Sequence, residues 1–336
     1  MKRWLVAPTV AALLLAGCSW RSDAPAPATR ERPRWTIQAS LLTPRDDFGL
    51  EVVDGRLWAV GGMTGERGNV LASVEVFDPA ASTWTQGPAM PTPRSSGGVA
   101  LLGSSIYVIG GMARGGAVSA AAESLDTRTG RWTTHAALPT PRMQLAAAVV
   151  DGKLWAIGGN DASGPPMGTV EIYDPVSDTW TPGPSLPTPR YGLSAAWFDG
   201  TVYTVGGTDT RRSLTTVEVL SAGHRHWTAG PPLPAPMTRL GLAAMDGWLH
   251  AVEGGGHFAL GAGATNWSEE APMPTSRHGL GLVSYRGKLY AVGGCKTYDV
   301  ADVSVNEVYQ PGGGRPMQRT LRAPEQAEIT DGQNAA

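Results

Sequence analysis

A repeated unit of 40 to 49 residues governs what this chain of 336 residues can fold into. The clearest copies begin with "MPTPR" at Met90, "LPTPR" at Leu138 and "LPTPR" at Leu186, and each runs through an apolar segment into a glycine pair. The pairs, one of them altered, lie at positions 61–62, 110–111, 158–159, 206–207, 253–254 and 293–294. Six tryptophans recur with the same steps, at Trp35, Trp84, Trp132, Trp180, Trp227 and Trp267. Two markers in register over six units indicate a repeat architecture.

Each unit has the pattern of four short strands. In the third unit we expect them at residues 144–151, 153–159, 169–175 and 179–187. Asp151-Gly152, between the first two, is a strong signal for a tight hairpin turn. A four-stranded sheet repeated with this period predicts an all-β propeller in which every unit builds one blade.

The repeat resembles the kelch family, whose unit carries a glycine pair, a Tyr-Asp-Pro-like turn and a spaced tryptophan. "VEVFDP" at Val74, "VEIYDP" at Val170 and "NEVYQP" at Asn306 match the turn. The resemblance covers residues 34–311 and implies a six-bladed kelch-type β-propeller that binds partners on its loop face. The fifth unit departs, because it is short and has Glu253 in place of the first glycine. We expect a truncated or irregular third strand there.

The strand register also predicts how the ring closes. Trp35 precedes the first glycine pair, so its strand has no other strands of a unit before it, and the last unit has no tryptophan strand after it. We therefore expect the strand around Trp35 to complete the sixth blade. Closure in this way removes exposed sheet edges, which are an aggregation hazard.

Both ends of the chain lie outside the predicted propeller. Residues 1–18 have the charged start and apolar segment of a signal peptide. They end in "LAGC", which resembles a bacterial lipobox and implies lipidation of Cys18; the alternative is an ordinary secretory signal with a chance cysteine. We expect residues 19–33 to be a flexible tether, 312–336 a disordered tail, and the protein to be lipid-anchored on an extracytoplasmic face of the bacterial cell envelope. Ser19 is compatible with outer-membrane sorting.

Composition and motifs limit the function classes. Charged residues make up 17%, whereas Gly (44) and Pro (27) are abundant, as expected for strands joined by turns. The net charge of -2 without a basic run argues against a nucleic-acid partner. We find no motif for a cofactor, for a metal (His224-x-His226 is the nearest spacing) or for a catalytic triad. We expect a monomer without cofactor or metal.

An arginine precedes the first strand of every unit, and the register places all six around one mouth of the central channel. As a ring they would bind an acidic peptide or an acidic sugar. The alternative is structural, because a glutamate begins five of the third strands on the same face and each could pair with an arginine. Arg239, which lacks such a glutamate, is then the candidate to remain available. The arginines are Arg45, Arg94, Arg142, Arg190, Arg239 and Arg277; the glutamates are Glu75, Glu123, Glu171, Glu218 and Glu307.

These features favour a non-catalytic, membrane-anchored module that binds an envelope or extracellular protein or a glycan. The alternative is an enzyme. The exported kelch proteins that are sialic-acid mutarotases carry a catalytic glutamate in an altered glycine pair, and Glu253 is similar in idea although it stands at the first glycine. A buried carboxyl group there would act as a general acid and base. A purely structural envelope role is the third hypothesis.

Overall fold

The computed structural model describes residues 33–65, 68–162, 164–221, 223, 225–296 and 301–312. The predictions for the signal peptide, Cys18, residues 19–32 of the tether and residues 313–336 of the tail lie outside this part of the chain, and so does His224. Within the described residues, no helix has the length and apolar character needed to cross a membrane.

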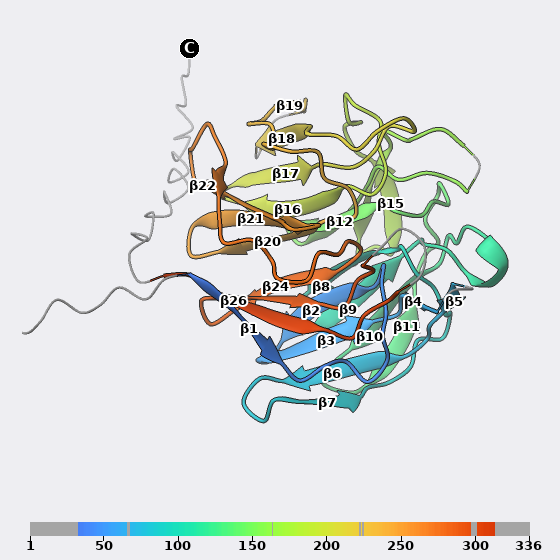
Figure 1. The fold of residues 1–336 in the computed structure, drawn as a ribbon. Coiled ribbons are helices and arrows are strands. Elements are labelled where there is room, and N and C mark those ends of the chain that lie inside the picture. The colour runs from blue at the N-terminus through green and yellow to red at the C-terminus, as the bar shows by residue number, and fades with distance from the viewer. Residues whose placement is uncertain are drawn as a thin grey trace, which may run out of the picture.

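The described residues form six four-stranded antiparallel sheets arranged around a central axis (Figure 1). Blade 1 contains β2 (Gly49–Val53), β3 (Arg56–Val60), β6 (Val74–Asp78) and β7 (Thr83–Gln86), and blade 2 contains β8 (Gly98–Leu102), β9 (Ser105–Ile109), β10 (Ala122–Asp126) and β11 (Arg131–Thr134). Blade 3 contains β12 (Ala146–Val150), β13 (Lys153–Ile157), β14 (Val170–Asp174) and β15 (Thr179–Pro182), and blade 4 contains β16 (Ser194–Phe198), β17 (Thr201–Val205), β18 (Val217–Ser221) and β19 (Thr228–Ala229). Blade 5 contains β20 (Gly241–Met245), β21 (Trp248–Glu253), β22 (Gly256–Gly261) and β23 (Ser268–Glu269), and blade 6 contains β24 (Gly281–Tyr285), β25 (Lys288–Val292), β26 (Asn306–Gln310) and β1 (Arg34–Gln38). The prediction of a six-bladed all-β propeller is confirmed.

Two small elements lie in the loops outside the blades. They are a two-stranded ribbon of β4 (Met63–Thr64) and β5 (Asn69–Val70), and the short 3-10 helix η1 (Arg114–Gly116). The first strands of the blades contact one another around the axis in the order β2, β8, β12, β16, β20, β24 and back to β2. Blades 1 and 4 therefore stand on opposite sides of the channel.

The hydrophobic core lies between neighbouring sheets rather than within one of them. One cluster, for example, joins Ile109 of blade 2 with Leu154 and Tyr173 of blade 3. Close approach of the inner strands requires small residues. A Cβ atom on Gly49 would lie 2.3 Å from the side chain of Val99 in the next blade. The glycine therefore sets how near two blades can come.

The six repeated tryptophans hold adjacent blades together. Each indole N–H donates a hydrogen bond to a backbone carbonyl oxygen of the preceding unit, as Trp132 does to Pro88 at 3.0 Å. The other five bonds run from Trp35 to Ala271, Trp84 to Ala39, Trp180 to Ala136, Trp227 to Pro184 and Trp267 to Pro231, at 2.7–2.9 Å. A partly buried indole with a partnered N–H is structural, so the tryptophans explain blade packing and not ligand stacking.

The N-terminal strand closes the ring as predicted. β1 is antiparallel to β26, with Trp35 opposite Tyr309, and the sheet order is β1-β26-β25-β24 (Figure 1). The Trp35 ring also contacts His257 of blade 5. The first and last segments of the propeller therefore depend on each other.

The expectation for the fifth blade is wrong. Its third strand, β22, is regular and six residues long, and it pairs with all of β21. The unit is short because Gly254 and Gly255 alone connect the two strands, where other units have a long loop. The fifth unit is therefore shorter than the others in its loop on the mouth face, and its sheet is complete.

Candidate functional site

Five of the six predicted arginines are structural. Their side chains are buried, with 0–1% of the residue exposed, and each forms an ion pair with the glutamate of the third strand in its own blade. We call them the strut arginines: Arg45, Arg94, Arg142, Arg190 and Arg277. Burial lowers the pKa of each strut arginine, and the paired carboxylate opposes that shift.

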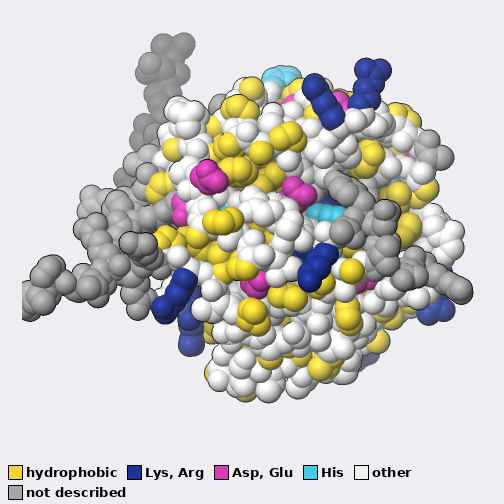
Figure 2. Space-filling view, in the orientation of Figure 1, with side chains coloured by type: hydrophobic (Ala, Val, Ile, Leu, Met, Phe, Trp, Pro, Cys, Tyr) yellow, Lys and Arg dark blue, Asp and Glu magenta, His cyan; other side chains and the backbone are white. Residues whose placement is uncertain are grey.

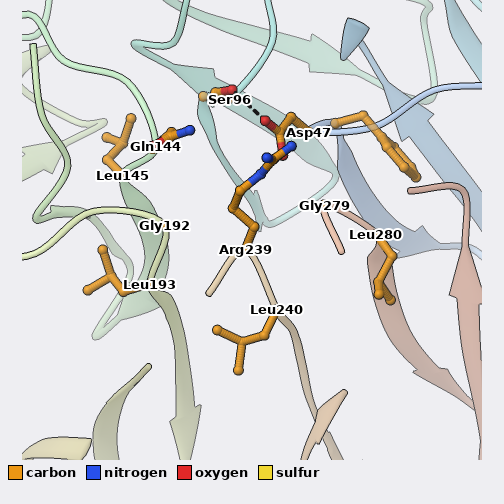
Figure 3. A pocket seen from close by; sticks show the side chains of 12 residues that line it. Asp47, Ser96, Gln144, Leu145, Gly192, Leu193, Arg239, Leu240, Gly279 and Leu280 are labelled. Atoms are coloured by element: carbon orange, nitrogen blue, oxygen red, sulfur yellow. Dashed lines mark hydrogen bonds and ion pairs between the residues drawn. The ribbon is translucent and has the colours of Figure 1, made fainter. Parts of the chain in front are cut away.

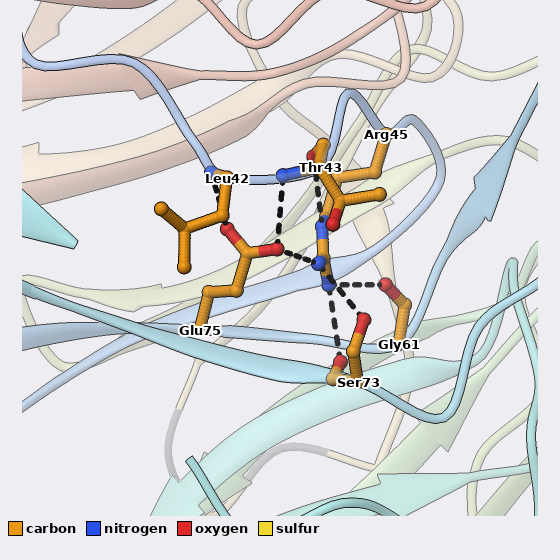
Figure 4. A network of polar contacts seen from close by, with 6 residues as sticks. All are labelled: Leu42, Thr43, Arg45, Gly61, Ser73 and Glu75. Atoms are coloured by element: carbon orange, nitrogen blue, oxygen red, sulfur yellow. Dashed lines mark hydrogen bonds and ion pairs between the residues drawn. The ribbon is translucent and has the colours of Figure 1, made fainter. Parts of the chain in front are cut away.

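Arg45 shows how one strut is built (Figure 4). Its guanidinium donates to the Gly61 carbonyl oxygen at 3.0 Å, to the Ser73 carbonyl oxygen at 3.1 Å, and to Glu75 at 2.5 Å. The Glu75 carboxylate also accepts hydrogen bonds from the backbone N–H groups of Leu42 and Thr43. One arginine thus locks the loop before the first strand onto the second and third strands.

The prediction of an accessible ring of arginines is therefore wrong for these five residues, and the alternative pairing with glutamates is confirmed. Figure 2 shows that the lysine and arginine side chains on the visible side of the propeller are scattered and do not form one patch. The physical reason is that a buried guanidinium needs a carboxylate and carbonyl oxygens around it. The arginine–glutamate pair meets that need in five of the six blades.

The fifth blade replaces the ion pair with an apolar pair. Arg239 is not in the register of the strut arginines, because it precedes its strand by two residues whereas Arg190 precedes its own by four. Met237 takes the strut position, and Phe258, which lies opposite Ala251, takes the position of the glutamate. Met237 and Phe258 are 2% and 8% exposed and belong to one core cluster.

Arg239 instead occupies a second ring, which narrows the channel. In each blade the residue two positions after the strut position donates its backbone N–H to the carbonyl oxygen of its counterpart in the preceding blade, at 2.6–2.9 Å. All six residues have a positive φ of 48–63°. They form what we call the axial belt: Asp47, Ser96, Gln144, Gly192, Arg239 and Gly279.

The residues of the axial belt surround a pocket of about 110 Å³ on the channel axis (Figure 3). The Arg239 side chain, 22% exposed, points toward Asp47. Its Nε donates to Asp47 and its Nη2 donates to Asp46, both at 2.9 Å. Asp47 also accepts a hydrogen bond from Ser96 at 3.0 Å. The pocket therefore presents an arginine and acceptor groups side by side.

Among the described residues, four carboxyl groups interact with the charge of Arg239, those of Asp46, Asp47, Glu253 and Asp302. Burial, together with the charge of Asp47, raises the pKa of Asp46 to about 8, although Arg239 lowers it. Burial also raises the pKa of Asp302. Asp46, Asp302 and the buried Cys295 present potential ligand atoms within 4.8 Å of one another, a geometry in which a divalent cation would compete with Arg239 for Asp46. The mouth is thus not the cationic ring that the sequence predicts.

Glu253 lies at the end of β21, half-buried and near enough to Arg239 for their charges to interact. Burial raises the pKa of Glu253 to about 7, and Arg239 lowers it. A carboxyl group with that pKa exchanges a proton readily at neutral pH. His257, which follows the altered glycine pair, is buried in β22.

Comparison with family models identifies the repeat. The model described as the KLHDC2/KLHL20/DRC7 Kelch-repeats domain matches residues 26–207, which is more than half of the chain. The model of the Kelch motif matches residues 189–234.

Characterised relatives match short parts of the chain. The F-box/kelch-repeat protein At1g16250 of Arabidopsis thaliana is 36% identical over 63 residues, covering 19% of this chain and 16% of its own length. Kelch-like protein 35 of Homo sapiens is 39% identical over 82 residues (24% and 14%), and Kelch domain-containing protein 8B of Rattus norvegicus is 38% identical over 88 residues (25% of each). The matches thus span at most a quarter of these relatives' lengths.

A solved structure agrees over most of the fold. The structure of YjhT superposes with a TM-score of 0.69 at 13% identity, covering 80% of this chain and 95% of that one. At this identity the likeness shows a common fold alone.

Proposed function

Because the chain belongs to the kelch-repeat family of β-propeller proteins, we propose that it is a binding module that recognises a protein or glycan ligand at the axial belt. The observation that carries this proposal is the exchange in blade 5. Blade 5 has Met237 at the buried strut position. Its arginine, Arg239, stands two residues later, at a partly exposed position on the channel axis. Its left-handed backbone conformation is shared by the whole axial belt and therefore belongs to the repeat, whereas the arginine side chain at this position belongs to blade 5 alone.

The groups around Arg239 define the ligand class. The guanidinium donates hydrogen bonds, while Asp47 and Gln144 offer acceptors, and Gln144 a donor as well. Since the neighbouring carboxylates offset the charge of Arg239, we favour a ligand with both hydroxyl or amide donors and acceptors over a strongly acidic one. A sugar or an exposed peptide loop has this character.

Replacing Arg239 with glycine is expected to weaken ligand binding at least tenfold and to change the melting temperature by less than about 2 °C. Glycine is suited to the positive φ and already stands at the equivalent positions Gly192 and Gly279. Asp46, whose pKa is about 8 with Arg239 in place, already holds a proton most of the time at neutral pH, and Asp47 keeps its hydrogen bond from Ser96 when the guanidinium is lost. Screening glycan and envelope-protein arrays identifies the ligand, and calorimetry then measures its affinity.

Arg211 provides the control, because it is an exposed arginine on another loop. We expect Arg211→Gly to bind the ligand as the parent chain does. Unchanged binding by Arg239→Gly would exclude the axial belt as the binding site.

The second candidate function is proton transfer on a sugar by Glu253, with its pKa of about 7 as the supporting observation. If the chain has this activity, it would accelerate the exchange between the anomers of sialic acid, and NMR would measure the rate of that exchange. Glu253→Gln would then slow the exchange by about 100-fold or more. A parent chain that leaves the exchange at its uncatalysed rate supports the binding module instead.

We also propose that a lipid on Cys18 anchors the propeller to an extracytoplasmic membrane face, supported by the "LAGC" sequence after the apolar segment. Acyl chains contribute about 0.8 kcal/mol per buried CH₂ group, so several chains hold a protein firmly. Replacing Cys18 with alanine is expected to abolish labelling with a radioactive fatty acid and to release the protein from the membrane fraction. Labelling equal to that of the parent chain would contradict a lipid at Cys18.

A further inference from the structure

The central channel continues beyond the axial belt as a second cavity. It has a volume of about 430 Å³, within the range of small-molecule sites. Three consecutive residues from the first strand of each blade line it: 50–52, 99–101, 147–149, 195–197, 242–244 and 282–284. This segment lies between the axial belt and the hairpin turns of the opposite face, and it shares no lining residue with the Arg239 pocket.

Glu51 is the one charged side chain among the described residues that line this cavity. The register places alanine at the equivalent position in blades 2 to 5 and valine in blade 6. The backbone N–H of Leu101 in the next blade lowers the pKa of the Glu51 carboxyl group. Burial has the larger effect and raises the pKa of Glu51 to about 8. A carboxyl group that no repeat pattern requires, in a cavity that disfavours its charge, points to a ligand.

Trp197 is the second feature of the cavity. It belongs to β16 in blade 4, on the opposite wall from Glu51 in blade 1, and it is 37% exposed. It stands one register position beyond that of Glu51, where the other blades have aliphatic residues or Ser284. The cavity thus has a carboxyl group on one wall and an indole on the opposite wall. An organic cation suits both, because each group attracts positive charge and the ring also suits an apolar body.

We propose that this cavity binds a small quaternary ammonium compound, with the Glu51 carboxylate as its counter-charge and the Trp197 indole as an aromatic wall. A cation is favoured over an anion because no basic side chain is among the described lining residues. The alanines leave room for a compact trimethylammonium group between blades 1 and 4.

Calorimetric titration of the full-length chain at pH 8 tests the proposal with choline and its uncharged isostere, 3,3-dimethylbutan-1-ol. We expect choline to bind in a one-to-one ratio and the isostere to bind at least tenfold more weakly, since only choline carries the charge. Glu51→Gln should reduce choline affinity at least tenfold, and Trp197→Leu by about fivefold. The control Glu269→Gln, at an exposed position on β23, should leave the affinity unchanged.

Proton linkage gives an independent readout. Because Glu51 must ionise to pair with choline, binding at pH 7 should release about one proton, and affinity should rise about fivefold from pH 7 to pH 8. Titrations in two buffers with different ionisation enthalpies count the proton. Equal binding of choline and its isostere, or choline affinity unchanged by both Glu51→Gln and Trp197→Leu, would overturn the proposal. The absence of choline binding would do so as well.

Discussion

Replacing Arg142 with methionine is expected to lower the free energy of unfolding by about 3–5 kcal/mol, because it leaves the buried carboxylate of Glu171 without its partner. It also deprives the carbonyl oxygens of Ala156 and Gly158 of their donors. The double variant Arg142→Met with Glu171→Phe should recover at least half of that loss. Blade 5 already folds with this pair, as Met237 and Phe258.

Urea unfolding followed by circular dichroism measures these differences. The control is Arg56→Met, since Arg56 lies 3.9 Å from Asp78 and the two side chains are 60% and 38% exposed. We expect no measurable change there, as for most surface ion pairs. A double variant less stable than Arg142→Met alone would show that the apolar exchange of blade 5 does not transfer to another blade.

Removing residues 19–42 is expected to lower the melting temperature by about 10 °C or more, or to cause aggregation. The deletion removes β1, and with it the pairing to β26, the Trp35 hydrogen bond to Ala271 and the buried side chain of Leu41. The sheet edge of β26 then becomes free to pair with other chains.

A shorter deletion of residues 19–33 serves as the control, because it ends before the first strand residue, Arg34. We expect its melting temperature to match that of the parent chain. The variant Trp35→Ala distinguishes the contribution of the tryptophan side chain from that of the whole strand. We expect its melting temperature to lie between those of the two deletion variants. Equal melting temperatures for both deletions would mean that β1 does not stabilise the ring.

The fold was predictable because two markers, the glycine pair and the tryptophan, repeat with the same steps. Their register also predicted that Trp35 completes the last blade. The fifth blade was misjudged, because a shortened unit does not reveal whether a strand or a loop has lost residues. Residue spacing alone does not distinguish the two.

The site was harder to predict, because residue type does not reveal burial. An arginine that follows a proline can either line the channel mouth or be buried as a strut. In the structure, the contacts of Arg45 with Glu75 and Gly61 show that it is buried as a strut. The different position of Arg239 was visible in the sequence. Arg239 precedes the first residue of its strand, Gly241, by two positions, whereas Arg190 precedes Ser194 by four. Glu51 was missed because a channel-facing position carries no repeat marker.

The central claim is that the strut arginines hold the blades whereas Arg239 serves the axial pocket. The most direct test is the free energy of unfolding in urea at pH 7 for single replacements at all six positions, with alanine at the five struts and glycine at Arg239. We predict losses of about 3–5 kcal/mol at each strut position and less than about 1 kcal/mol for Arg239→Gly. A loss at Arg239 as large as those at the struts, or struts that can be replaced without loss, would contradict the claim.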